Sequence, residues 1–267
     1  MGALEARPRS RECHRVENAD LSHHILSRFN ADLEQLRSNV LQMGGLVESQ
    51  LKLALEALLE GDSAAGDEVV RAEYEVNAMQ VSIDDECSRI LATRAPAASD
   101  LRLVVAIIKT VTDLERIGDE AEKVGYIASH HASLERPIDH YRVMRHLGRV
   151  VQEIVRDALD AFARLDARTA LEVAKRDRLI DEEYDSAQRQ CITFMIEDPR
   201  SIRRTIDMLW IARALERIGD HAKNICEYVI YMVYGRDVRH VSMRDVERHI
   251  ESLSETQTVG VGGPTEA

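Results

Sequence analysis

The chain has little of what a β-sheet or disulfide-bonded protein needs. Aromatic residues make up 4% of its 267 residues, only five residues are proline, and its four cysteines show no Cys-x-x-Cys spacing. Sheets draw on aromatic and β-branched side chains, so this composition favours long helices. Unpaired cysteines without metal-ligand spacing are typical of small core side chains in a reducing compartment.

Two further absences concern partners and location. The formal net charge is -12, whereas a protein that binds nucleic-acid backbone needs a basic surface. No apolar run approaches the about 20 residues that span a bilayer, and the arginine-rich N-terminus lacks the apolar segment of a signal peptide. We therefore expect a cytoplasmic protein that binds no nucleic acid and meets membranes only peripherally, through its partners. Its acidity suits a cation or a basic protein.

An internal repeat organises the chain. Residues 115–119 read Glu-Arg-Ile-Gly-Asp, and residues 216–220 repeat the same run 101 positions later. Upstream, similar residues recur at an offset of 104, so that Cys87 matches Cys191. Repeats decide architecture before any single residue does. The chain therefore holds two versions of one unit, which differ by three residues in one connection.

Apolar periodicity predicts three helices in the first copy. Hydrophobic side chains over Leu26–Leu58 recur every three or four residues, which indicates a long amphipathic helix. Gly61 is a plausible stop, and Asp62 or Ser63 can cap the second helix. Asp100 opens the third helix, which carries the repeated motif.

The second copy repeats this order, with helices expected over about 139–165 and 166–196 and, after a turn at Asp198-Pro199, a last helix that ends near Gly235. Three helices joined by short turns must be antiparallel neighbours. The predicted fold class is therefore all-α, with two tandem pseudo-symmetric three-helix bundles and six long helices. The expected divisions are a mobile N-terminal tail over 1–21, a first repeat over 22–131, a second repeat over 139–235, and a partly disordered C-terminal tail over 236–267.

The repeated motif places two carboxylates on one face of each third helix. Positions i and i+4 lie above one another, so Glu115 shares a face with Asp119, and Glu216 shares one with Asp220. The second pair points about 120–160° away from the apolar stripe of its helix, so we expect it to face outward. A solvated surface would explain a single pair. Like charges repeated beside a mid-helix glycine, which costs about 1 kcal/mol, favour a bound cation and a close approach to the backbone.

A second acidic pair lies within a core stripe. Asp177, followed one turn later by Asp181, belongs to the apolar stripe of its helix, and Glu73 holds the matching place in the first copy. A carboxylate there needs a partner, either an arginine or a metal ion, and both remain open. Asn77 replaces the second acid in the first copy, so we expect tighter metal binding in the second. Such oxygen ligands suit Mg²⁺, Mn²⁺, Ca²⁺ or ferric iron.

These motifs resemble the PhoU family of bacterial phosphate-signalling regulators. Leu-Glu-Arg-Ile-Gly-Asp occurs in each half of the chain. The other matching stretches are Phe29–Arg37, Gln42–Glu48, Asp100–Arg102 and Gly235–His240, so the likeness covers about residues 23–240.

The resemblance implies a regulatory adaptor that restrains the phosphate regulon when phosphate is plentiful. Its implied partners are the ATPase subunit of the phosphate ABC transporter and the phosphate sensor histidine kinase, and we also expect a homodimer. The family binds metal clusters at Glu/Asp-x-x-x-Asp motifs on the bundle surface. The candidate metal ligands in this chain are Glu73, Glu115, Asp119, Asp177, Asp181, Glu216 and Asp220.

A di- or multi-metal carboxylate enzyme, a hydrolase or an oxidase, is the alternative function. It would need an enclosed pocket and a general base. The sequence has no phosphate-binding glycine loop, no dinucleotide-binding motif and no His-Glu-x-x-His. Outward-facing acids without a repeated histidine favour the adaptor without catalysis. Whether the acids lie in a cleft or on open surface discriminates between the two functions.

Overall fold

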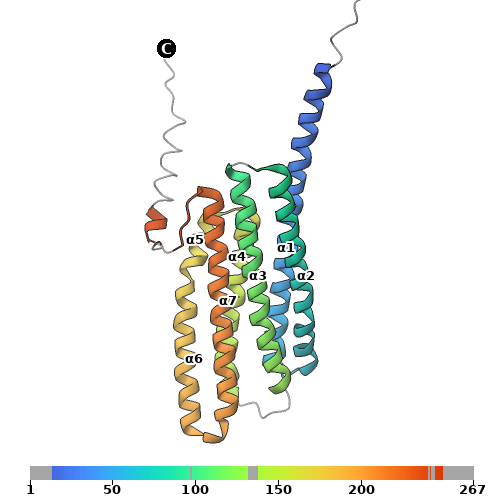
Figure 1. Ribbon diagram of the computed structural model, residues 1–267. Helices are drawn as coiled ribbons and strands as arrows, with labels where there is room; N and C mark the ends of the chain where they lie inside the picture. Colours follow the sequence, from blue (N-terminus) through green and yellow to red (C-terminus); the bar gives the residue numbers. More distant parts are fainter. Residues whose placement is uncertain (1–13, 97, 132–137, 240, 242–243, 249–267) are drawn as a thin grey trace, which may run out of the picture.

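The computed structural model describes residues 14–96, 98–131, 138–239, 241 and 244–248, and within them all regular structure is helical (Figure 1). The long helices run side by side as one elongated bundle, which confirms the predicted all-α class. No helix in this part of the chain is apolar over enough length to cross a membrane. In chain order the elements are α1 (His14–Glu60), α2 (Ser63–Arg94), α3 (Ala98–His131), α4 (Ile138–Arg164), α5 (Ala167–Lys175), α6 (Asp177–Glu197), η1 (Pro199–Ser201) and α7 (Ile202–Tyr234).

The turn after the first helix of the first repeat has the predicted chemistry. Gly61 adopts a left-handed conformation (φ 75°) at the end of α1. The Asp62 carboxylate then accepts hydrogen bonds from the backbone N–H groups of Ala64 and Ala65, at 2.9 and 3.2 Å. Asp166 caps α5 in the same way. Each such cap stabilises its helix by about 1 kcal/mol, because it satisfies N–H groups that have no partner within the helix.

The helix predicted over about 166–196 is instead two helices, α5 and α6, separated at Arg176. There the backbone tightens, because the Arg176 N–H bonds to the Val173 carbonyl three residues back. The Arg176 guanidinium reaches α4, where it pairs with Asp157 at 2.5 Å and Glu153 at 3.5 Å. The break places Asp177 in the first turn of α6, where free N–H groups favour a carboxylate.

Both predicted tails are partly described. Helix α1 begins at His14, so residues 14–21 are helical, earlier than the predicted boundary near residue 22. At the other end, residues 244–248 are helical, and Glu247 pairs with Lys175 of α5 at 2.6 Å. Residues 1–13 and 249–267 lie outside the described residues.

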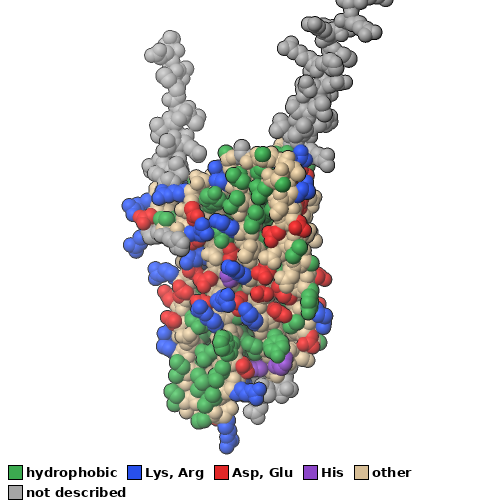
Figure 2. All heavy atoms as spheres, in the orientation of Figure 1, with side chains coloured by type: hydrophobic (Ala, Val, Ile, Leu, Met, Phe, Trp, Pro, Cys, Tyr) green, Lys and Arg blue, Asp and Glu red, His purple; other side chains and the backbone are tan. Residues whose placement is uncertain are grey.

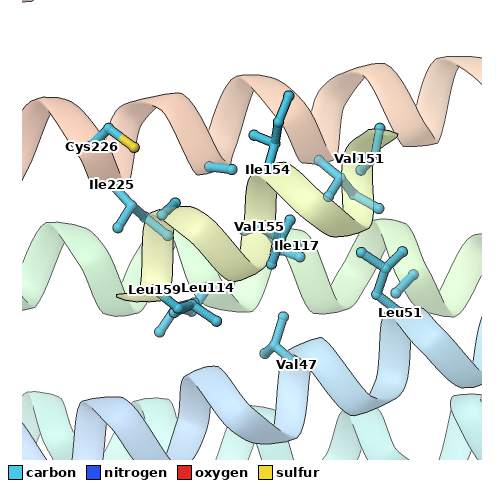
Figure 3. Close-up of a cluster of buried hydrophobic side chains, with 14 of the residues drawn as sticks. Val47, Leu51, Leu114, Ile117, Val151, Ile154, Val155, Leu159, Ile225 and Cys226 are labelled. Carbon is cyan, nitrogen blue, oxygen red and sulfur yellow. The ribbon is translucent and has the colours of Figure 1, made fainter. Parts of the chain in front are cut away.

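The two repeats pack face to face around one shared core rather than two separate ones. Their crossing is reciprocal. A Cβ on Gly44 of α1 would lie 2.6 Å from Leu159 of α4, and one on Gly148 of α4 would lie 2.6 Å from Leu55 of α1. Since these positions match in the repeat, the units are related by a pseudo-twofold axis. Figure 3 shows the buried side chains that α1, α3, α4 and α7 contribute to this core, among them Val47, Leu51, Leu114, Ile117, Val151, Ile154, Val155, Leu159, Ile225 and Cys226.

Candidate carboxylate sites

The first carboxylate cluster joins α2 to α3, and we define it as Glu73, Glu115, Asp119 and Glu122. Glu73 extends from α2 and is buried, with 5% of its surface exposed. It reaches α3 beside Gly118, where a Cβ would lie 2.6 Å from its Oε2. The mid-helix glycine thus makes room for the neighbouring helix of the same repeat, which is the close approach that the sequence predicted.

Glu73 has little to compensate its charge. Gln50 of α1 donates a hydrogen bond from Nε2 to Glu73 Oε2 at 2.9 Å, but Oε1 of each residue is buried without a hydrogen-bond partner. Burial raises the pKa of Glu73 to about 7, with Asp119, Glu122 and Glu115 adding to the rise and Gln50 opposing it. A metal ion or a proton would remove this cost.

The other acids of the first cluster lie half-buried on α3. Burial, and then the charge of Asp119, raise the pKa values of Glu115 and Glu122. Lys123 lies nearby on the same helix, but its ammonium pairs with Glu120 at 2.9 Å instead of with these acids. The charge of Lys123 still opposes the pKa rise of both acids, and that of Arg116 opposes it for Glu115, but neither cation pairs with a carboxylate of the cluster.

The second carboxylate cluster joins α6 to α7, and we define it as Asp177, Asp181, Glu216 and Asp220. Burial, followed by neighbouring carboxylates, raises the pKa values of Asp181, Glu216 and Asp220. Asp177 is buried, as its place in a core stripe predicts, and Lys223 Nζ lies 2.6 Å from its Oδ2. The chain thus provides the partner that the buried acid requires, although it is a lysine and not an arginine.

The chain also supplies an arginine to the second cluster. Arg213 Nη1 lies 2.6 Å from Glu216 Oε1. In the first copy the matching position holds a threonine, Thr112, and Glu122 stands where the second copy has Lys223. The two clusters therefore occupy equivalent places but differ in charge. Figure 2 shows the acidic side chains crossing the middle of one face of the bundle, mixed with basic ones over α7.

The acids are less exposed than the helix geometry predicted. Glu115 and Asp119 are half-buried and the Glu216 side chain is 12% exposed, whereas Asp220 and Asp181 of the second cluster are open to solvent. The predicted outward direction was measured against the apolar stripe of a single helix, whereas α2 and α6 pack beside that stripe and cover part of the acidic face. An open groove of about 630 Å³ runs past Asp220 and Lys223.

The side chains fit a hard cation in chemistry but are not arranged around one. Within the described residues, no three His, Cys, Asp or Glu side chains converge closely enough to hold a metal ion as they stand. The donors are all oxygens, and buried oxygens of Glu73 and Glu216 have no hydrogen-bond partner. Binding would therefore require side chains of the clusters to rotate toward the ion.

A buried polar network that the sequence did not reveal joins the two repeats between α3 and α7. Asp113 accepts a hydrogen bond from Asn224 Nδ2 at 3.1 Å, and its Oδ1 lies 2.7 Å from His221 Nδ1. Burial first, then Asp113, raise the pKa of Tyr228. Nearby, Glu120 of α3 pairs with Arg217 of α7 at 2.7 Å. The residues of this network differ from those at the matching positions of the other repeat, and that difference is the only signal in the sequence that could have indicated it.

Comparisons with known proteins agree with this architecture. The PhoU domain model matches residues 40–128 and 144–229. A phosphate-specific transport system accessory protein PhoU homolog of Pseudomonas putida is 47% identical over 253 residues, covering 94% of this chain and 99% of that protein. The accessory protein PhoU of Escherichia coli K12 is 42% identical over 234 residues, covering 87% and 96%.

Solved structures show the same fold. The crystal structure of PhoU from Pseudomonas aeruginosa has a TM-score of 0.76 and 51% identity, covering 78% of this chain and all of that one. The phosphate transport system regulatory protein PhoU from Streptococcus pneumoniae has a TM-score of 0.73 and 29% identity, covering 79% and 99%. The relatives are named as accessory or regulatory proteins and not as enzymes, in agreement with the expected lack of catalysis. With its two tandem domains of this type, the chain belongs to the PhoU family.

Proposed function

We propose that this protein is a cytoplasmic, metal-binding adaptor that regulates phosphate uptake. It would link the ATPase subunit of a phosphate ABC transporter to a phosphate sensor histidine kinase, and hold the phosphate regulon down when phosphate is plentiful. Relatives named as phosphate-transport accessory proteins support this context. The observation that carries the metal-binding part is the buried carboxylate of Glu73, which faces three further carboxylates of the first cluster.

The first cluster is the better candidate for tight cation binding. Asn77 led us to expect tighter binding in the second copy, but the ion pairs of Lys223 and Arg213 argue for the reverse order. A metal ion at the second cluster must compete with these two cations. At the first, it meets acids whose pKa values are raised by burial and by one another and which form no ion pair within the described residues.

The oxygen-only donors of the first cluster suit Mg²⁺, Mn²⁺, Ca²⁺ or ferric iron. Glu73, Glu115 and Asp119 would hold the ion, with Glu122 beside them. The ion would supply positive charge where α2 and α3 meet. Because the acids come from both helices, its binding would fix the packing of α2 against α3 and with it the surface presented to partners.

Metal analysis of matched variants tests the metal-binding part. Glu115→Gln with Asp119→Asn should remove most of the bound metal from the purified protein, and Glu216→Gln with Asp220→Asn should remove less. Circular dichroism checks that both variants remain helical. Unchanged metal content in both would refute the assignment, and a larger loss from the second pair would restore the order first expected from Asn77.

Gene deletion tests the regulatory part. Deletion in the host should raise phosphate-regulon expression in phosphate-rich medium, because an adaptor acts by stoichiometric binding and its loss frees the kinase. The Glu115→Gln, Asp119→Asn variant should restore repression poorly. Low expression after deletion would refute the adaptor function. The expected homodimer remains a prediction that sedimentation equilibrium of the full chain would check.

A further inference from the structure

An open apolar groove lies between α3 and α7. It has a volume of about 600 Å³, and Tyr126, Ile127, Trp210 and Ala214 form its apolar surface. Trp210 is 65% exposed and Tyr126 is 56% exposed, although such large rings normally bury most of their surface. Figure 2 shows hydrophobic side chains gathered over the lower part of this face, below the band of charged residues.

The apolar surface continues along α7 beyond the groove. Ile202 and Ile206 are also exposed, and with Trp210 they form a stripe at intervals of four residues. Such spacing places the three side chains on one face of the helix. A contiguous apolar stripe that the fold leaves open marks a binding surface more often than an isolated exposed side chain does.

The rim of the groove presents positive charge. Lys123, Arg213 and Arg217 stand around it, and each side chain is about half exposed. Their carboxylate partners lie beneath them: the Glu120 side chain is 5% exposed and the Glu216 side chain 12%. The acids thus anchor the basic side chains from below while solvent meets the cationic groups. Glu122, also at the rim, belongs to the first cluster.

We infer that this α3–α7 groove is the docking site for an amphipathic helix of a partner protein that carries acidic residues beside its apolar ones. A groove between two helices with anchors spaced by four suits a helix laid into it, and Trp, Tyr and Arg are the residues that dominate protein interfaces. The cationic rim selects acidic residues in the partner. The inference rests on the proposed adaptor function and names the surface that the adaptor uses.

A second copy of the chain fits the groove less well than a different protein does. A twofold contact centred here would place the same patch against itself. The three rim cations would then face three others, and like charges across an interface cost free energy. The groove is therefore assigned to a heterologous partner.

Site-specific crosslinking in the host tests the assignment. Trp210 is replaced by a photo-reactive phenylalanine derivative in the full-length protein, and crosslinked peptides are identified by mass spectrometry. The expected product is a peptide rich in Asp and Glu, with apolar residues every three or four positions. Tyr74 on α2, which is 76% exposed, is the matched control position for a surface ring outside the groove.

A variant that lacks two of the basic side chains around the groove gives a second test of the assignment. Lys123→Gln with Arg213→Gln removes two cations but leaves Arg217 in place to pair with the buried Glu120, and should lower the crosslinking yield about tenfold. Crosslinks only to copies of this chain, to basic peptides, or equally from Tyr74 would overturn the inference, as would the absence of any product at position 210.

The sole tryptophan gives an independent readout, because its emission reports on this groove alone. The peptide identified by crosslinking should shift Trp210 emission to shorter wavelength and protect it from acrylamide. The phosphate-regulon assay separates the two hypotheses. If deletion of the gene raises expression but Trp210→Asp, at normal protein level, represses fully, the groove assignment fails while the adaptor function stands.

Discussion

Replacing Glu73 by glutamine removes a buried charge without changing the shape of the side chain, and stability should then respond differently to pH. In metal-free buffer the folded protein holds a proton on Glu73 up to about pH 7, because burial and its acidic neighbours raise the pKa from 4.5. The unfolded chain releases that proton near the ordinary value. Between these pH values the folded state binds more protons, so the free energy of unfolding falls as pH rises.

The size of the effect follows from the pKa difference. Each unit is worth about 1.4 kcal/mol, so a carboxylate that titrates near 7 in place of 4.5 destabilises the wild type by about 3 kcal/mol once the pH exceeds both values. Glu73→Gln should therefore be more stable than the wild type by up to about that amount at about pH 8, and nearly equal to it at about pH 4.

Urea unfolding in the presence of a chelator, repeated across this pH range, measures the difference. Glu75→Gln is the matched control, since Glu75 lies on the same helix but is exposed. Added Mn²⁺ or Mg²⁺ should narrow the difference at high pH, because an ion at 100 times its Kd stabilises the folded wild type by about 2.7 kcal/mol and the variant less. If the free energy of unfolding varied with pH in the same way for the wild type and for Glu73→Gln, the charge of Glu73 would be compensated. The argument from its raised pKa would then be wrong.

Three further predictions concern the second cluster, the helix contact and the polar network. Lys223→Ala frees the buried carboxylate that it pairs with, so metal affinity at the second cluster should rise about tenfold in isothermal titration; no change would show that the lysine does not compete. Gly125→Ala should destabilise the protein to urea by about 1–3 kcal/mol, because its Cβ would lie 2.7 Å from Cβ of Val69 on α2, an atom that cannot move aside without the helix. Gly45→Ala, with no atom within 4 Å of the new Cβ, should instead stabilise by about 1 kcal/mol, and equal effects would refute the packing argument. Asp113→Ala should cost about 1–3 kcal/mol by leaving buried donors unpaired, and a neutral result would mean that water satisfies them.

Much of the fold could be predicted from local pattern because its causes are local. Apolar spacing indicates which face of each helix is buried. Asp62 and Asp166 mark the starts of helices, because their carboxylates accept hydrogen bonds from backbone N–H groups only two or three residues later. The break at Arg176 could not be predicted in this way. Nothing near it in the sequence forbids a helix, and its ion pairs are with residues of α4, about 20 positions away.

In the candidate sites, too, the features with local causes could be predicted and those that depend on distant residues could not. The repeat identified the acids of both clusters, since recurrence at fixed spacing is visible in one sequence. Their compensation was not visible, because Lys223 reaches Asp177 across 46 residues and His221 reaches Asp113 across 108. Solvent exposure was also misjudged, because the stripe of a single helix does not reveal how far its neighbour overlaps the adjacent face.

The reciprocal crossing of α1 and α4 means that the two repeats of one chain pack against each other as the two subunits of a homodimer would. Gly44 meets Leu159 as Gly148 meets Leu55, which is the contact that two identical subunits would make across a twofold axis. In a true homodimer every substitution appears twice. Here each half changes alone, which allows Lys223 to occupy one half while Glu122 remains in the other. Covalent fusion thus gives a symmetric scaffold two unequal halves, whose equivalent positions carry different charges.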